Sequence, residues 1–358
     1  MANPNTTEIA SLSSTPTWLL TGQSGTSSLE FDPEFPLPPL SPHDVLVRIH
    51  AASLNYRELA IASGKFNTLL TPPITPSSDG AGEVVQTGAM VTEFAPGNDV
   101  VTHLTVHCDL DDNATFESVK AGLGQGVHGT LRKYAVFHES SLMHMPYLSY
   151  REAATLTCSG LTAWNALFGA GDGLTVLVQG SGGVSVAALQ FALAANATVI
   201  ATTSSDTKAA KLKTLGAHHI INYKEQTNWG DIARFLTPHS RGVDIIIDVG
   251  GSSTISESLK AVRTDGLISL TGLLGGAAKE SDPSIMAGLM FLCRTRGVLL
   301  GTRRQFKEMN AFIEERGVKP VVDEWVFKFD EVKEAYEYLE TQRHFSKVVV
   351  DVDYDEGL

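Results

Sequence analysis

The stretch Val176-Leu177-Val178-Gln179-Gly180-Ser181-Gly182-Gly183-Val184 carries the most information about the architecture of this 358-residue chain. Its first residues are apolar and β-branched, as in a buried strand, and small residues then form a turn. A helix-like stretch follows to Ala194, and a second apolar strand follows at Thr198–Thr202. This order predicts the opening strand–helix–strand unit of a dinucleotide-binding fold, in which the helix N-terminus offers free N–H groups to a pyrophosphate.

We expect the turn itself to contact the cofactor, through Gly180, Ser181, Gly182, Gly183 and Val184. Glycine-rich turns also join ordinary strands to helices, so a purely structural turn is the alternative. The strand before the turn, the helix after it and the strand beyond favour a cofactor site. A nicotinamide cofactor would restrict the chemistry to hydride transfer.

Strands and helices alternate throughout residues 160–302, which predicts a parallel, doubly wound sheet. The six expected strands are Thr175–Gln179, Thr198–Thr202, His219–Asn222, Asp244–Asp248, Leu267–Thr271 and Val298–Leu300. Ligands bind such sheets at the carboxyl ends of the strands. We therefore expect Val249 and Gly250, after the fourth strand, and Thr271 and Gly272, after the fifth, to contact the cofactor.

The remainder of the chain has another character. Short alternating strands are expected at Asp44–Ala51, Gly80–Val85 and Asp99–Thr102, with prolines crowding the loops, which predicts a β-barrel-like domain. After Thr302, two helices and a last strand at Lys347–Val350 are expected to return to that first domain. The predicted division is residues 1–155, 156–302 and 303–358, with residues 1–14 as a loose tail.

Composition excludes several classes of protein. The net charge of −13 and pI near 5.3 oppose nucleic acid as a partner. No run reaches about 18 consecutive apolar residues, so no membrane span is expected. The N-terminus lacks the features of a signal peptide. Three widely spaced cysteines indicate a reducing compartment, and the cytoplasm is the expected location.

Several motifs occur together in one order along the chain. They are Asn55-Tyr56-Arg57-Glu58, Ser78-Asp79-Gly80-Ala81-Gly82-Glu83-Val84-Val85, the segment from Ala153 to Trp164, the glycine turn and His344-Phe345-Ser346-Lys347-Val348-Val349-Val350. With them, residues from about 40 to 352 resemble the medium-chain dehydrogenase/reductase superfamily. The resemblance implies an α/β fold with a GroES-like β-barrel catalytic domain and a Rossmann doubly wound parallel sheet. It also implies a homodimer, and the apolar segment Gly297–Gly301 is one place where two chains would pair.

Zinc-dependent members of this superfamily hold a catalytic metal with a cysteine, a histidine and a third ligand. Here Asn55 and Ser78 stand at the first two positions, and only Cys158 remains. A catalytic zinc needs about three protein ligands, which Cys158 does not supply even with help from Asp79. We therefore predict no metal. The resemblance is then closest to the zinc-independent quinone oxidoreductase and enoyl reductase-like branch, which reduces activated C=C bonds.

The type of nicotinamide cofactor is indicated by the end of the second strand. NAD-selective Rossmann domains place an acid there, whereas this chain has Thr203 and Ser204. Lys208, one helical turn further, supplies a positive charge for a 2′-phosphate, which Asp206 slightly weakens. The alternative is that Lys208 is an ordinary solvated helix residue. Tyr223 matches a tyrosine that closes the phosphate pocket in the quinone reductase branch. These residues predict NADP(H).

The resemblance also implies roles for residues in the catalytic domain and its surroundings. Asn55 would face the nicotinamide and donate to a substrate carbonyl, and Tyr56 is the local candidate for a proton donor, with packing or a phosphate contact as the alternative. Thr162 and Lys347 would contact the cofactor. Ser346 stands where relatives usually have glycine, so the loop geometry there is expected to differ.

The leading hypothesis is an NADPH-dependent, zinc-independent oxidoreductase that transfers a hydride to an activated C=C bond of an enone, enoyl or quinone substrate. The substrate would be a small, apolar, carbonyl-containing molecule. One alternative is a metal-free carbonyl reductase or alcohol dehydrogenase. Another is a biosynthetic enzyme for a specialised metabolite, with the loop at residues 104–128 shaping its pocket. A third is a non-catalytic NADPH-binding sensor.

Overall fold

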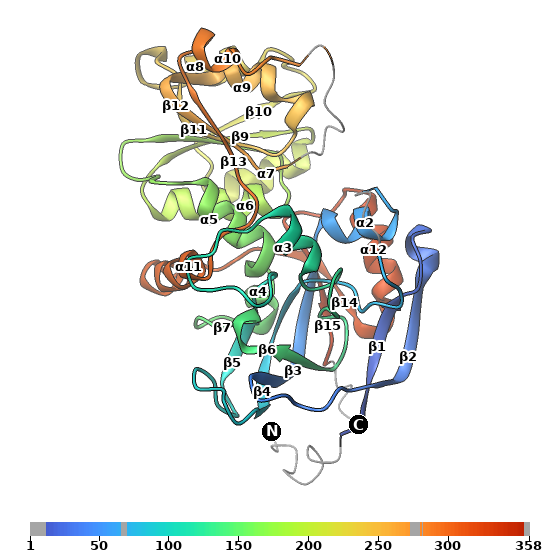
Figure 1. The fold of residues 1–358 in the computed structure, drawn as a ribbon. Helices are drawn as coiled ribbons and strands as arrows, with labels where there is room; N and C mark the ends of the chain where they lie inside the picture. Colours follow the sequence, from blue (N-terminus) through green and yellow to red (C-terminus); the bar gives the residue numbers. More distant parts are fainter. Residues whose placement is uncertain (1–11, 66–69, 273–279, 281, 354–358) are drawn as a thin grey trace. The chain divides into compact units, whose positions relative to one another are not determined.

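The computed structural model describes residues 12–65, 70–272, 280 and 282–353 (Figure 1). The strand of the glycine-rich motif is the first strand of a parallel sheet. The chain divides into two units. Unit 1 consists of Met1–Cys158, Thr302–Glu314 and Val322–Leu358, and unit 2 consists of Ser159–Gly301 and Glu315–Val321. Residues 1–11 of the expected tail lie outside the described residues, and the first strand begins at Ser14.

Unit 2 contains, within its described residues, one parallel sheet of six strands in the order β10-β9-β8-β11-β12-β13. The strand order reverses beside β8, which confirms the predicted doubly wound sheet. The strands are β8 (Thr175–Gln179), β9 (Thr198–Thr203), β10 (His219–Asn222), β11 (Val243–Asp248), β12 (Val262–Leu270) and β13 (Arg294–Gly297).

Burial explains why these segments are strands. Every residue of β8 and β11 is buried, as expected for central strands covered on both faces. Their apolar side chains form a core with Trp229 and Leu259 from the helices. The helices of this unit are α5 (Leu161–Ala166), α6 (Gly183–Ala194), α7 (Asp206–Thr214), α8 (Trp229–Phe235), α9 (Ile255–Ala261) and α10 (Ala287–Met290).

The predicted position of the sixth strand is wrong by four residues. The strand lies at Arg294–Gly297, where it pairs with Leu267–Leu270 of β12, and not at Val298–Leu300. Val298 and Leu300 are buried just beyond it, and Leu300 has a positive φ of 61° that ends the extended backbone. The apolar residues Val298 and Leu300 belong to the buried loop after the strand, whereas the edge strand itself contains Arg294 and Arg296.

Unit 1 contains a sheet in which seven strands are described, with the order β14-β15-β3-β4-β5-β7 and β6 paired to β3. The last strand of the chain therefore lies inside the sheet, antiparallel to β3 and parallel to β14. A separate hairpin joins β1 (Ser14–Leu20) and β2 (Leu29–Pro36). The sheet strands are β3 (Asp44–Leu54), β4 (Asp79–Thr87), β5 (Asp99–Thr102), β6 (Tyr134–His138), β7 (Leu142–His144), β14 (Val322–Lys328) and β15 (Lys347–Asp351).

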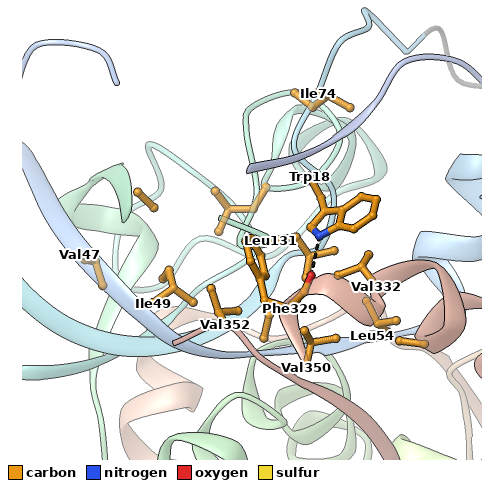
Figure 2. Packing of buried hydrophobic residues seen from close by; sticks show 14 of the residues in the cluster. Trp18, Val47, Ile49, Leu54, Ile74, Leu131, Phe329, Val332, Val350 and Val352 are labelled. Carbon is orange, nitrogen blue, oxygen red and sulfur yellow. Dashed lines mark hydrogen bonds between the residues drawn. The ribbon is translucent and has the colours of Figure 1, made fainter. Parts of the chain in front are cut away.

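The core of unit 1 unites the beginning and the end of the described chain (Figure 2). Trp18 of β1 packs there with Leu54 and Val350, and its indole Nε1 donates a hydrogen bond of 2.6 Å to the main-chain oxygen of Phe329. A buried indole N–H needs such a partner, so this bond fixes the segment before α12. The helices are α2 (Tyr56–Ala62), α3 (Phe116–Ala121), α4 (Tyr150–Ala153), α12 (Val332–Glu340) and most of α11 (Arg303–Arg316).

The segment at residues 104–128 contains α3, whose N-cap Thr115 accepts a hydrogen bond from the backbone N–H of Ser118. Among the described residues, no helix combines the length and apolar character that crossing a membrane requires.

Candidate active site

The glycine-rich turn of unit 2 has the geometry of an anion-binding site. Gly180 has a φ of 78°, and no atom lies within 4 Å of a Cβ placed at Gly180 or Gly182. Gly182 is the N-cap of α6, and no side chain caps this helix. The first backbone N–H groups of a helix have no partner within the helix, so those of α6 remain available to an anion.

The five predicted residues of this turn are brought together at the carboxyl end of β8. Ser185, which replaces the last small residue of the dinucleotide pattern, has a structural role. Its hydroxyl donates a hydrogen bond of 2.6 Å to the main-chain oxygen of Gln179 and so ties the first turn of α6 to the strand. The substitution therefore preserves the turn.

A buried network fixes the next loop at this edge of the sheet. Asp248, the last residue of β11, is completely buried and accepts hydrogen bonds from Gln179 Nε2 (3.1 Å), Ser258 Oγ (2.6 Å) and Thr254 Oγ1 (2.7 Å). Gln179 Oε1 in turn accepts from the N–H of Val249 (3.2 Å). The sequence analysis did not identify Gln179 and Asp248 as site residues. A carboxylate at the end of an otherwise apolar strand is the feature that could have revealed Asp248.

The same network brings the predicted residues after β11 and β12 together. Thr271 donates to the main-chain oxygen of Asp248 through both its N–H (2.8 Å) and its hydroxyl (3.1 Å). Gly272 packs so tightly that a Cβ there would lie 2.6 Å from the oxygen of Val249. Val249, Gly250, Thr271 and Gly272 thus form one surface beside the glycine-rich turn, because β8, β11 and β12 are adjacent strands.

The residues predicted to select the nucleotide lie together at the ends of β9 and β10. Thr203 is buried, and its main-chain oxygen accepts a hydrogen bond of 3.0 Å from the N–H of Tyr223, whose side chain is 40% exposed. Ser204 follows, and Lys208 lies in the first turn of α7. Thr162 is buried on α5, which packs on α6 through Trp164 and Phe191.

Unit 1 contains a buried group of charged and polar side chains around Lys347. The ammonium of Lys347 donates to the main-chain oxygen of Leu54 (2.8 Å), to Asp79 Oδ2 (3.3 Å) and to Asn55 Oδ1. Lys347, Asp79 and Asn55 are 3%, 0% and 8% exposed. The structure therefore brings together two predicted site residues, Asn55 and Lys347, that are separated by 292 positions in the sequence.

Asp79 is held from other sides as well. Its Oδ1 accepts from Ser78 Oγ (2.7 Å), and its Oδ2 accepts from the N–H of Cys158 (3.3 Å). Burial raises the pKa of the Cys158 thiol to about 12, and the nearby Asp79 carboxylate adds to this effect. Among the residues that the structure describes, no three His, Cys, Asp or Glu side chains are placed to hold a metal ion.

Glu58 and Arg57 continue this group along α2. Glu58 is buried and accepts from the N–H of Asn55 (2.7 Å), and burial raises its pKa above the ordinary value, partly offset by Arg57. Arg57 donates to the main-chain oxygens of Leu123 and Val119, both at 3.1 Å. The motif therefore anchors both α3 and the segment that follows it to α2.

Tyr56 has different neighbours from Asn55. Its side chain is 42% exposed and lines a pocket of about 170 Å³ with Tyr336 and Glu340 of α12 and Lys65. Burial raises the pKa of the Tyr336 hydroxyl well above its ordinary value. The two predicted catalytic residues are consecutive in sequence, but only Asn55 belongs to the buried group around Lys347.

Comparisons with known proteins cover most of the chain. Residues 41–147 match the family model of the alcohol dehydrogenase GroES-like domain, and residues 183–315 match that of the zinc-binding dehydrogenases. A zinc-type alcohol dehydrogenase-like protein of Schizosaccharomyces pombe is 41% identical over 322 residues, which are 88% of this chain and 92% of the relative.

Two further comparisons agree. The 2-methylene-furan-3-one reductase of Solanum lycopersicum is 30% identical over 357 residues, which are 98% of this chain and 82% of that protein. The crystal structure of an NAD-dependent alcohol dehydrogenase has a TM-score of 0.83 at 30% identity and covers 94% of this chain and 99% of its own. The fold of this chain is thus shared with a solved alcohol dehydrogenase structure.

Proposed function

Because this chain belongs to the medium-chain dehydrogenase/reductase superfamily, a family of oxidoreductases, we propose that it reduces activated C=C bonds with NADPH and without zinc. The substrate would be a small enone, enoyl or quinone compound. The observation that carries the proposal is the ammonium of Lys347, which is held between Asn55 and Asp79 in the buried group of unit 1.

The residues at the metal-ligand positions of zinc-dependent relatives do not fit zinc. Asn55 Oδ1 already accepts from a cation, and a second cation beside the Lys347 ammonium would be repelled. The hydroxyl of Ser78 donates to Asp79. Burial and the neighbouring Asp79 carboxylate raise the pKa of the Cys158 thiol, which disfavours the thiolate that zinc binds.

The residues of unit 2 do fit a dinucleotide. The open space at Gly180 and Gly182 lets a pyrophosphate approach the backbone, and the uncapped N-terminus of α6 offers N–H groups to its oxygens. Residues 203–205 carry no carboxylate that would repel a 2′-phosphate, and Lys208 supplies positive charge one turn into α7. These features support NADPH over NADH.

The chemistry then divides between the cofactor and this chain. When bound, NADPH would supply the hydride that reduces the β-carbon of the substrate. Asn55 donates an N–H to the carbonyl oxygen, which stabilises the negative charge that develops there. A proton from Tyr56 or water then completes reduction at the α-carbon. The name of the Solanum lycopersicum relative, a 2-methylene-furan-3-one reductase, describes reduction of such a methylene ketone and supports this substrate class.

The proposal is tested by mixing purified protein with an enone and either NADPH or NADH, and by identifying the product. Consumption of NADPH with formation of the saturated ketone is expected. An allylic alcohol would instead indicate a carbonyl reductase, and tight NADPH binding without turnover of any enone or carbonyl compound would indicate a sensor. Treatment with a zinc chelator is expected to leave the rate unchanged, and a loss restored by added zinc would contradict the zinc-free mechanism.

A further inference from the structure

We propose that Lys347 is a positioning residue that sets the orientation of the Asn55 side-chain amide, so that its nitrogen and not its oxygen is presented to the substrate. This inference rests on the proposed function, in which Asn55 donates to a carbonyl oxygen. It gives Lys347 a role that differs from the cofactor contact implied by the resemblance.

The chemistry of the two side chains determines the orientation. An ammonium group carries hydrogen-bond donors only, whereas an amide has an acceptor oxygen at one end and a donor nitrogen at the other. Lys347 Nζ contacts one end of the Asn55 amide, and that end must therefore be Oδ1. The opposite orientation would place two donors against each other, which is unfavourable in a buried site.

Lys347 is itself unable to move away. It is 3% exposed, and its contacts to Leu54, Asn55 and Asp79 account for the three N–H bonds of an ammonium. β15 is paired with β3, with Val348 opposite Leu54, so the backbone before and after these residues is fixed by the sheet.

The position of Asp79 strengthens this arrangement. Its carboxylate is completely buried and accepts from Ser78 Oγ, from the N–H of Cys158 and, at 3.4 Å, from Ser53 Oγ. A carboxylate that is fixed on several sides holds the ammonium at one point. The Asp79–Lys347 pair therefore works as a rigid support for the Asn55 oxygen.

The backbone of Asn55 is fixed independently, because its N–H donates to Glu58 Oε2 at 2.7 Å. The capping box of α2 also directs the Asn55 side chain toward the backbone N–H of Glu58, which favours the same orientation of the amide. Lys347 adds the charged donor to Oδ1. Without the ammonium, the amide could present its oxygen to a substrate carbonyl, and two acceptors would repel. Loss of Lys347 should therefore reduce the catalytic rate much more than it weakens NADPH binding.

A double-mutant cycle of Lys347→Met and Asn55→Ala tests the proposal. Each single variant is expected to lower kcat about 100-fold, which is typical of losing one donor to a developing oxyanion, while the Kd for NADPH changes less than about threefold. The double variant should be only a few-fold slower than either single variant, because both changes remove the same interaction. Lys347→Arg, which keeps a cationic donor, should recover part of the rate. Lys333→Met, an exposed lysine on α12, serves as the matched control and should behave as the unmodified protein.

Two results would overturn the inference. One is a Kd for NADPH that rises tenfold or more in Lys347→Met with kcat unchanged, which would indicate a cofactor contact. The other is a double variant whose loss of kcat equals the product of the two single losses. If Lys347→Met does not fold, Lys347→Met combined with Asp79→Asn replaces it, because this pair of changes leaves no lone buried charge.

The same cycle, measured as unfolding equilibrium constants, separates this inference from the proposed function. If the unmodified protein reduces no enone, the proposed function fails. The contact is then judged by stability alone: non-additive losses at residues 55 and 347 support it, and additive losses contradict it.

Discussion

Gln179 and Asp248, the last residues of two neighbouring parallel strands, are joined by a hydrogen bond of 3.1 Å between buried side chains. Through this bond the turn after β8 and the loop after β11 are held in one arrangement. Both segments contain residues predicted to bind the cofactor. The rigidity of the proposed nucleotide site thus depends on a polar network beneath it.

Asp248→Asn tests this dependence. Both carboxylate oxygens of Asp248 accept hydrogen bonds, so the amide nitrogen of the variant would face a donor. The variant should therefore lose about 2 kcal/mol of unfolding free energy. It should also bind NADPH more weakly. Urea unfolding and fluorescence titration with NADPH measure the two effects. Asp265→Asn, the same change at a side chain that is 76% exposed, should alter neither. An Asp248→Asn variant with unchanged stability would contradict the role of the network.

Lys208→Ala tests the preference for NADPH. If Lys208 pairs with a 2′-phosphate, its loss should raise the KM for NADPH about tenfold or more and leave the KM for NADH nearly unchanged, because a charged hydrogen bond contributes about 1.5–3 kcal/mol. Steady-state rates with each cofactor measure this. Lys213→Ala, further along α7, is the control. Equal losses with both cofactors would refute the assignment.

Glu58→Gln tests the buried carboxyl of α2. Because burial raises the folded-state pKa of Glu58 above 4.5, the folded protein binds a proton more tightly than the unfolded chain, and its stability falls as the pH rises from 4.5 through the folded pKa. Arg57, Asp79, Lys347 and Tyr336 are the ionisable groups near it.

The glutamine variant cannot ionise, so it should lose less stability than the unmodified protein as the pH rises above 4.5. Unfolding free energies at several pH values give the comparison. Glu117→Gln, at an exposed position on α3, should show the same pH dependence as the unmodified protein. Parallel curves for Glu58→Gln and the unmodified protein would show that Glu58 makes no such contribution.

Ser346→Gly tests the backbone before Lys347. Ser346 has a φ of 65°, in the left-handed region that disfavours residues with a Cβ by roughly 1–2 kcal/mol. Glycine adopts this conformation without that cost, although it increases the freedom of the unfolded chain, so the variant should be more stable by up to about 1 kcal/mol. Thermal and urea unfolding measure the difference, with Ser346→Ala as the control that keeps the Cβ. A Ser346→Gly variant less stable than Ser346→Ala would be the contrary result.

The sequence predicts the sheet of unit 2 well, because strands such as Thr175–Gln179 and Asp244–Asp248 are short, largely apolar runs separated by helical segments. It misplaces the edge strand. The segment Arg294–Gly297 contains two arginines and lacks the apolar pattern of a strand, whereas Val298–Leu300 is apolar. Apolar pattern reports burial, and at this edge burial and strand pairing fall on different residues. The turn around Gly180 is predictable since its small residues are consecutive.

The buried group of unit 1 could not be predicted in the same way. The motifs point separately to Asn55 and Lys347, but nothing local in either motif shows that the two side chains meet. Their contact follows from the pairing of β15 with β3, which is a property of the whole sheet. The sequence points to Asp79 only as an acid beside the metal-ligand position Ser78, and its contact with Lys347 depends on long-range pairing within the same sheet.

The position of β15 between β3 and β14 has a consequence for biosynthesis. Almost all of unit 2 leaves the ribosome as one continuous stretch, so its strands are available to pair during translation. The unit 1 sheet must wait for residues 347–351, since β6 pairs only with residues 44–48 on that edge of β3 and residues 51–54 have no neighbour there until β15 is made. A nascent chain that stalls before this strand would expose an apolar edge able to pair with other chains, and chaperones would be its first partners.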